Sequence, residues 1–281
     1  MSFYPVSDYL ALPRNAVSWV VEDILPTGGL LNIYGKPKSH KSFLALQIAQ
    51  AVADPNIKEV AGFPVHQHGK VAYLQVDTPR GLWADRLIRW FPDMQQGVAL
   101  ADAEVVPYPF NILGDGFKWL KDSVAACQPL VVFIDTLREI HIGDENDSSH
   151  MQLVVNTLAS ACKPAAVVML SHARKNSAEG GFALMDENRG SGYVAGRMDA
   201  VVYLSKEKLT YQTRTAKLDS FEIFRTPLVQ LKDPVSVMAA RLAATPGLTM
   251  PQMIATLRAR FPSITQDAAR GQLRRAQEGE G

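Results

Sequence analysis

Cysteine is scarce in this chain: among its 281 residues only Cys127 and Cys162 occur, each within an apolar stretch of helical character. Two such residues do not form a disulfide framework, which favours a reducing compartment. No apolar run reaches the roughly 18 residues that a membrane helix needs. Residues Met1 to Tyr9 also lack the basic start and apolar run of a signal peptide. We therefore expect a cytoplasmic protein without a membrane segment.

An excess of charge is also absent. The formal net charge is +1, and charged residues make up 20% of the chain. Proteins that coat nucleic acid through bulk charge are more basic, so any such contact has to come from local patches. The hydrophobic content of 47% is enough for a full core, either in one large α/β domain with an appendage or in two small domains.

Apolar runs alternate with amphipathic stretches, which is typical of an α/β fold. The runs that we expect to form strands are residues 30–34, 71–76, 98–106, 130–134 and 166–170. The stretches that we expect to form helices are residues 42–52, 79–91, 117–127 and 151–162. Three more strands, with short polar connections that indicate an antiparallel edge, are expected at residues 200–204, 209–213 and 221–231.

The composition changes after Pro234, where the chain becomes rich in Ala and Arg and poor in strand formers. Two helices are expected at residues 252–261 and 266–277, and their tight connection resembles a helix-turn-helix unit. In the second helix the spacing places Arg270, Arg274 and Arg275 near one face. This face fits DNA contact, a subunit contact or simple exposure to solvent, and the spacing does not decide between them.

A loop rich in small and basic residues separates the first expected strand from its helix. Its residues and the first helical ones are Gly35, Lys36, Pro37, Lys38, Ser39, His40, Lys41, Ser42 and Phe43. In such a loop the backbone N–H groups surround phosphate oxygens, the lysine reaches the β- and γ-phosphates, and the serine hydroxyl ligates Mg²⁺. His40 stands where the pattern has its second glycine, and it tolerates a positive φ less well than glycine does. The pattern predicts a binding site for ATP and Mg²⁺.

A second motif, an acidic residue at the end of an apolar run, supports this prediction. The apolar run from Leu130 ends at Asp135, roughly 90 residues after the loop. A carboxylate at the end of a strand beside a phosphate loop holds the metal and its water shell. We therefore expect Ser42 and Asp135 to bind the metal.

Several motifs occur in one order between about Val17 and Leu231. They are Trp19–Pro26, Gly28–Leu30, Gly69–Leu74, Phe133–Arg138, Glu145–Asn146, Leu170–Lys175 and Arg189–Ser191. Together with the phosphate loop they resemble the RecA-type ATPases, in particular the branch typified by plasmid RepA hexameric replicative helicases and related phage ATPases. The resemblance implies a RecA-like P-loop core with a mostly parallel central sheet and antiparallel edge strands in residues 1–234. A small helical, helix-turn-helix-like extension in residues 235–281 would follow it.

The resemblance also implies an activity. A ring of subunits, most often six, hydrolyses ATP between neighbours and pulls single-stranded DNA through its centre. Two alternatives share the same site: a RecA-like ATPase for recombination or strand annealing, and a nucleotide-binding regulator with little hydrolysis. The substitutions at His40 and Asp77 favour the regulator, because the family has a glycine and a glutamate at these positions.

By the same resemblance, residues in or after the strands have catalytic roles beside Lys41 and Asp135. Asp77 would orient the attacking water, although it is shorter than glutamate by one methylene, about 1.5 Å; capping the helix ahead of Pro79 is its alternative role. His172 would sense the γ-phosphate, unless it is an ordinary structural histidine.

The resemblance further implies that an arginine completes the site of the neighbouring subunit. Arg197 is our choice, Arg189 is its rival, and an ordinary surface arginine remains an open reading. The loop after His172 carries Arg174 and Lys175, which we expect to contact the phosphates of single-stranded DNA.

Overall fold

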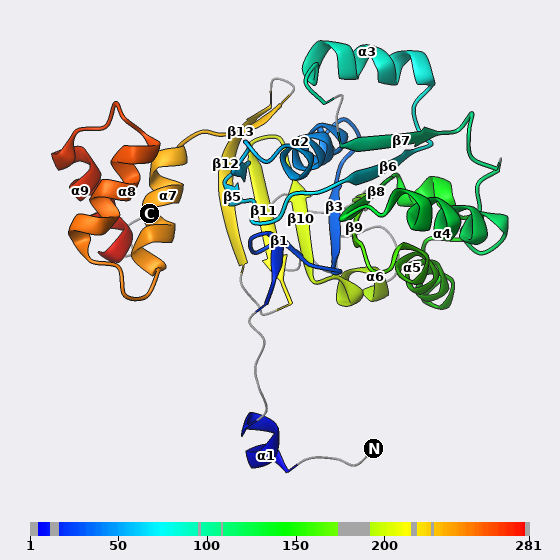
Figure 1. Ribbon diagram of the computed structural model, residues 1–281, viewed down its shortest axis with the longest axis horizontal. Coiled ribbons are helices and arrows are strands. Elements are labelled where there is room, and N and C mark those ends of the chain that lie inside the picture. The colour runs from blue at the N-terminus through cyan, green and yellow to red at the C-terminus, as the bar shows by residue number, and fades with distance from the viewer. Residues whose placement is uncertain are drawn as a thin grey trace.

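The computed structural model describes residues 5–11, 17–94, 97–107, 109–173, 192–214, 218–225 and 228–278. Within them the chain forms one large sheet with the strand order β13-β12-β11-β10-β3-β9-β8-β6-β7 (Figure 1). In chain order its strands are β3 (Leu30–Gly35), β6 (Val71–Gln75), β7 (Val98–Asp102), β8 (Val131–Asp135), β9 (Ala166–His172), β10 (Ala200–Leu204), β11 (Lys208–Thr213), β12 (Leu218–Arg225) and β13 (Val229–Leu231).

Two kinds of pairing divide this sheet. The strands from β10 through β3, β9, β8 and β6 to β7 are parallel neighbours, whereas β11, β12 and β13 extend the sheet antiparallel. This is the predicted mostly parallel sheet with an antiparallel edge, so the fold class is confirmed. Two small antiparallel pairs lie outside it: β1 (Trp19–Val21) with β2 (Leu25–Pro26), and β4 (Glu59–Val60) with β5 (Phe63–Pro64).

The central parallel strands β3, β8, β9 and β10 are buried along almost their whole length and mostly apolar, because helices cover both faces of the sheet there. Along β3, Leu31 and Ile33 belong to one buried cluster and Leu30 and Tyr34 to another, as the period-2 alternation of a strand requires. The first cluster includes α2 (Lys41–Ala53) and Trp83 of α3 (Arg80–Trp90), and the second includes α4 (Asp115–Cys127) and α5 (Ser148–Cys162). Figure 1 shows these two pairs of helices on opposite sides of the sheet.

There are three shorter helices before the C-terminal region: α1 (Val6–Ala11), the 3₁₀ helix η1 (Leu137–Ile140) and α6 (Gly192–Arg197). In the described part of the chain no helix has the length and apolar character needed to cross a membrane.

The edge strand β13 is fixed by a side chain from α2. The amide of Gln47 accepts a hydrogen bond from the backbone N–H of Val229 at 2.8 Å and donates one to its carbonyl at 3.1 Å. These are the two backbone groups that another strand would otherwise bind. Gln47 therefore takes the place of a neighbouring strand at this position.

Two sequence predictions about the last third of the chain were incomplete. The single strand expected at residues 221–231 is two strands, β12 and β13, paired antiparallel. The helix α7 (Pro234–Ala244) was not predicted, although its start has a clear local signal. Asp233 accepts a hydrogen bond from the N–H of Ser236 at 2.9 Å, and Pro234 occupies the first turn.

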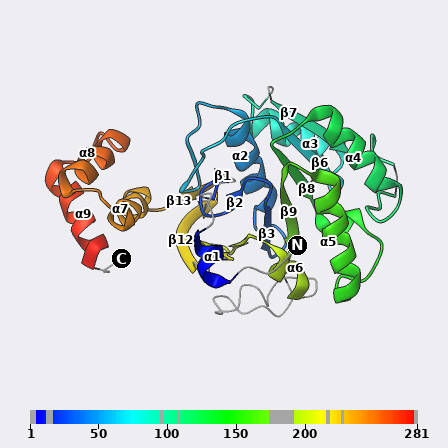
Figure 2. The ribbon, with the colours of Figure 1, turned by 60° about the horizontal axis from the view of Figure 1, so that its bottom comes forward.

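The two helices predicted in the C-terminal region are present as α8 (Met250–Arg260) and α9 (Gln266–Glu278). With α7 they form a three-helix bundle that has a buried cluster of its own: Ala239, Leu242, Met253, Ile254, Leu257, Ala269 and Leu273. Figure 2 shows the bundle beside the β13 edge of the sheet, joined to it by one short connection. The division of the chain into a core of residues 1–234 and an extension of residues 235–281 stays a prediction.

One arginine of the bundle contacts the core of the large domain. The guanidinium of Arg241 on α7 lies 5.5 Å from the ring centroid of Phe63. Phe63 in turn packs edge-on against Tyr211 of β11, with 5.1 Å between the ring centroids. A cation over an aromatic face is attracted by the ring quadrupole. This stack therefore fixes α7 against the sheet.

Candidate nucleotide-binding site

The phosphate loop connects the carboxyl end of β3 to the first turn of α2. Two of its residues adopt left-handed backbone conformations: Lys38 at a φ of 62° and His40 at a φ of 68°. For a residue with a side chain this conformation costs about 1–2 kcal/mol. His40 thus keeps the backbone conformation that a glycine would take without strain. Its ring lies 5.5 Å from that of Phe43, one turn into the helix.

Gly35 is the position of the loop that no side chain fits. A Cβ atom there would lie 2.5 Å from the carbonyl oxygen of Leu204 and 2.7 Å from the hydroxyl of Ser39. Both distances are shorter than van der Waals contact allows, and the first atom belongs to rigid backbone. The glycine therefore lets β3 and β10 approach each other at the point where the chain turns into the loop.

Lys41 is buried and folded back over the loop. Its Nζ donates hydrogen bonds to the carbonyls of Gly35 at 3.0 Å and Lys36 at 3.1 Å. Burial lowers the pKa of Lys41 to about 8, while the nearby carboxylates of Asp135 and Asp77 oppose this shift. The predicted phosphate-binding lysine therefore shares one electrostatic environment with both predicted acids.

Asp135 ends β8 with a fully buried carboxyl group. Its Oδ2 accepts a hydrogen bond from the hydroxyl of Tyr73 at 3.0 Å. Burial raises the pKa of Asp135, and hydrogen bonding from Ser42 and Tyr73 opposes the rise. In the described part of the chain, the buried Oδ1 has no hydrogen-bond partner. An unsatisfied carboxylate oxygen beside a serine hydroxyl is an oxygen donor set suited to Mg²⁺, so the residues present fit this metal.

Asp77 lies in the connection between β6 and α3. Pro79, not Asp77, is the residue that precedes the first helical residue of α3, and Asp77 is exposed. Its charge nevertheless acts on both Lys41 and Asp135. The backbone of this connection is tied to the Asp135 strand by a hydrogen bond from the N–H of Val76 to the carbonyl of Asp135, at 3.1 Å. The position therefore suits the predicted role at the phosphate end of the site better than the capping role.

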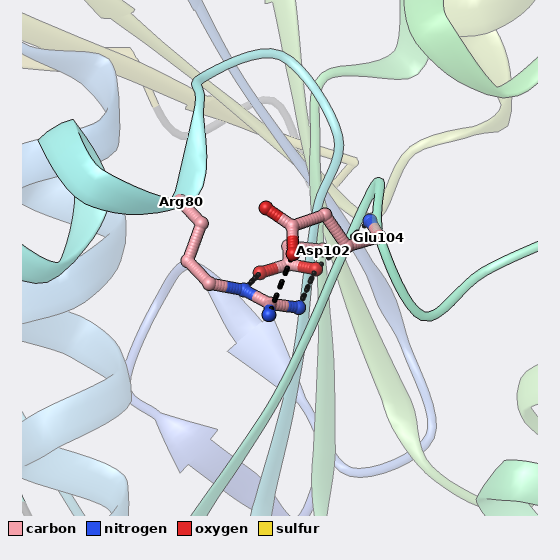
Figure 3. Close-up of polar contacts among 3 residues, drawn as sticks. All are labelled: Arg80, Asp102 and Glu104. Atoms are coloured by element: carbon pink, nitrogen blue, oxygen red, sulfur yellow. Dashed lines mark hydrogen bonds and ion pairs between the residues drawn. The ribbon is translucent and has the colours of Figure 1, made fainter.

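A clamp that the sequence did not predict fixes the far end of the same connection. Arg80, the first residue of α3, donates from Nε and Nη2 to the two carboxylate oxygens of Asp102 at 2.6 and 2.8 Å (Figure 3). Its Nη1 lies 2.6 Å from Oε2 of Glu104. The paired contacts lower the pKa of Asp102. A bidentate arginine restricts orientation as well as distance, so the start of α3 is held on β7, three residues after Asp77.

His172 ends β9, the strand directly beside β3. It is in register with Gly35, and the next residue, Ala173, donates its N–H to the Gly35 carbonyl at 3.1 Å. The predicted sensor histidine is thus adjacent to the first residue of the phosphate loop. The predicted DNA contacts Arg174 and Lys175 follow at once, but they and Arg189 lie outside the described residues.

Arg197 lies near the amino ends of the parallel strands, whereas the phosphate loop of its own chain lies at their carboxyl ends. It ends α6 just before β10 begins, and its Nε contacts Oδ1 of Asn156 on α5 at 3.4 Å. Nearby, Asp199 accepts a hydrogen bond from the N–H of Leu30, the first residue of β3. Arg197 therefore does not belong to the site of its own chain, and a role in the site of a neighbouring subunit stays a prediction.

A second arginine, Arg214, lies beside Arg197, and the sequence did not predict it. Arg214 donates from Nη2 to the Arg197 carbonyl at 2.8 Å, and its Nε lies 3.5 Å from Oδ1 of Asp199. It directly follows β11, where nothing in the local pattern marks it. Arg214 comes close to Arg197 and Asp199 only because β11 pairs antiparallel with β10.

The loop after η1 is closed by two histidines. Nε2 of His150 lies 3.2 Å from Nδ1 of His141, and Arg138 donates to the carbonyl of Gly143 at 3.1 Å. A Cβ atom at Gly143 would lie 2.3 Å from the His150 ring, so the loop passes directly against that ring. Burial lowers the pKa of His141 to about 4, with further contributions from His150 and Arg138. The acidic loop of residues 143–147 is therefore held by a neutral imidazole.

Comparison with known proteins identifies a family and similar solved structures. The profile of a family described as the AAA domain matches residues 2–178. Among solved structures, a KaiC-like protein from the hyperthermophilic archaeon Pyrococcus horikoshii OT3 superposes with a TM-score of 0.49 at 10% sequence identity. The superposition covers 75% of this chain and 93% of that one.

The Arg80 clamp generates a first prediction. Replacing Arg80 by Ala releases the start of α3 and misplaces Asp77, so turnover of ATP should fall between about tenfold and a hundredfold, while ATP affinity changes little. Steady-state turnover and nucleotide titration measure the two effects separately. Arg89→Ala removes the same side chain from the last turn of α3 and should leave turnover unchanged; equal turnover in the two variants would contradict the clamp.

The histidine pair generates a second prediction. Because the pKa of His141 is about 4 in the folded protein and 6.5 in its ordinary state, the unfolded chain binds more protons between these values. The free energy of unfolding should therefore fall as the pH drops through this window. In His141→Gln this part of the fall is absent. Urea unfolding of both chains across the window measures the difference, and parallel curves would refute the assignment.

Proposed function

The chain belongs to the AAA domain family, and we propose that this P-loop ATPase is a DNA-dependent motor that works as a ring-shaped replicative helicase of plasmid or phage type. The substrate is ATP with Mg²⁺, and the partners are single-stranded DNA and further copies of the chain, six to a ring.

One observation carries the proposal beyond nucleotide binding. The carbonyl of Gly35, which opens the phosphate loop, accepts the N–H of Ala173 at 3.1 Å. Ala173 is the residue before Arg174 and Lys175, whose cationic side chains suit the phosphates of a single strand. A change at the phosphate loop is therefore transmitted through one backbone hydrogen bond to the start of the segment that would grip DNA. A motor has to couple its nucleotide site to its DNA contacts, whereas a protein that only binds nucleotide does not.

The chemistry assigned to the site follows from the side chains present. Lys41 already lies over the loop and exchanges the carbonyls of Gly35 and Lys36 for phosphate oxygens when ATP binds. Ser42 and Asp135 hold Mg²⁺, which neutralises charge on the transferred phosphoryl group when it is bound. Asp77 orients the attacking water, and His172 senses the γ-phosphate from the next strand.

The location of Arg197 supports a site shared between subunits. Within the chain it lies at the amino end of β10, whereas the phosphate loop follows the carboxyl end of β3. A head-to-tail ring brings opposite edges of neighbouring subunits together. In that arrangement Arg197 of one subunit completes the transition-state contacts of the next.

A regulator with little hydrolysis is the second candidate, and two observations favour it. His40 holds a left-handed conformation at a cost that a glycine avoids, and Asp77 is shorter than the glutamate of the resembled family.

The deciding experiment measures ATP turnover with and without single-stranded DNA, together with the mass by light scattering and the unwinding of a forked duplex. A helicase gives DNA-stimulated turnover, a hexameric mass and unwinding. Stimulated turnover without unwinding selects the recombination or annealing alternative. No turnover in the presence of DNA would refute a motor and leave the regulator.

Substitutions at Asp77 test the catalytic assignment. Asp77→Glu should raise turnover, because the longer side chain reaches the attacking water. Asp77→Asn should lower turnover by about 10²-fold or more, since the general base is lost. Asp85→Asn removes an exposed acid from α3 and serves as the control. If Asp77→Asn matches this control, Asp77 takes no part in the chemistry.

A further inference from the structure

The helix-turn-helix-like region is a predicted motif that the nucleotide site leaves unused. We propose that the C-terminal bundle is a second nucleic-acid site, which binds double-stranded DNA through the exposed arginines of α8 and α9. This site is independent of the single-strand contacts assigned to the loop after β9 and does not rest on the motor function.

The geometry of the two helices suits a DNA duplex. The turn between α8 and α9 is closed by a hydrogen bond from the N–H of Ile264 to the carbonyl of Phe261 at 3.0 Å, and Thr265 caps α9 through the N–H of Ala268. In α9 only Ala269 and Leu273 are buried. Gln272 also accepts a hydrogen bond from Ser236 of α7, and Ala276 packs against the cluster. The opposite face of α9, which carries Arg270 and Arg274, is exposed, and a helix of about 10–12 Å diameter fits the major groove of B-DNA, which is about 12 Å wide.

Charge distinguishes the bundle from the rest of the chain. Residues 234–278 contain six arginines and two acids, whereas the whole chain has a net charge of only +1. The remainder of the molecule is therefore net acidic, and positive charge is concentrated here. Because the whole protein is nearly neutral, a contact with nucleic acid needs a local basic surface, and the bundle provides one.

Five of the six arginines of the bundle are exposed, and two of these five already have contacts within the chain: Arg260 lies over the ring of Phe261 at 5.8 Å, and the charge of Arg275 acts on Asp233. Arg241 is used against Phe63, but the other five are exposed: Arg258, Arg260, Arg270, Arg274 and Arg275. Across the described ranges none of these five forms an ion pair. Arg270 and Arg274 are four residues apart, about 6 Å along the helix axis, so both lie on the same face of α9.

A surface groove gives the site its shape. A hollow of about 530 Å³ lies where α8 meets the start of α9. Ile254 and Ala255 line it together with Arg258 and Arg270. Apolar lining between two guanidinium groups suits a sugar-phosphate backbone, whose phosphates attract the arginines while the deoxyribose packs on the apolar atoms. The exposed positive charge selects an anionic polymer over an apolar protein segment.

The test measures binding of a fluorescein-labelled DNA duplex to the full chain by anisotropy, without nucleotide, at several salt concentrations. Arg270→Ala/Arg274→Ala should weaken binding about tenfold or more at low salt and reduce the slope of log Kd against log salt by about two. Lys118→Ala/Lys121→Ala removes the same charge from exposed positions on α4 and should bind like the unmodified chain. Asp267→Asn, which removes an acid from the first turn of α9, should tighten binding.

The variants also have to keep the fold of the bundle. Because Arg270 and Arg274 are exposed, the double variant should show the unmodified circular dichroism spectrum and thermal midpoint. Duplex affinity equal to that of the unmodified chain in this variant would overturn the proposal, as would the absence of duplex binding by the unmodified chain. A chain that binds duplex without turning over ATP would remove the motor function and leave this site intact.

Discussion

The parallel pairing of β3 with β9 is the constraint on which the rest of the structure depends. It places Gly35 and His172 in register, and it joins the phosphate loop to Ala173 by one hydrogen bond. Since β8 and β6 continue the same parallel order, the ends that carry Asp135 and lead to Asp77 reach the same edge of the sheet. Residues far apart in sequence therefore meet in one site because every parallel strand ends there.

Local patterns predicted those parts of the site that lie in or beside one strand. The loop from Gly35 to Ser42 and the acid at Asp135 follow from short motifs, and apolar runs marked their strands. Local patterns could not predict the Arg80 clamp. Its partner Asp102 lies 22 positions away in the sequence and is brought near only by the pairing of β6 with β7. The division of β12 from β13 was missed although Thr226 and Pro227 interrupt the run between the two strands. The helix α7 was missed although Asp233 and Pro234 mark its start.

The site balances burial against charge. Lys41 and Asp135 both lose hydration, and burial shifts the pKa of each toward its neutral form. Their proximity to each other, and to Asp77, opposes the shift for the lysine and keeps a cation where phosphates arrive. In contrast, the arginines of α8 and α9 stay exposed and charged. The two sites that we propose would thus recognise anions in different ways: a buried site that is shaped for a single triphosphate, and an exposed one on the bundle.

The amide of Gln47 has a consequence for how copies of this chain meet. A sheet edge with free backbone N–H and C=O groups is a template on which a strand from another molecule can assemble, and natural proteins suppress this route to aggregation. At Val229 both groups are already bound by Gln47, β13 spans only Val229–Leu231, and the bundle follows at once. Growth of the sheet from one molecule into the next is thereby blocked at Val229, so a contact between copies at this edge would have to use side chains.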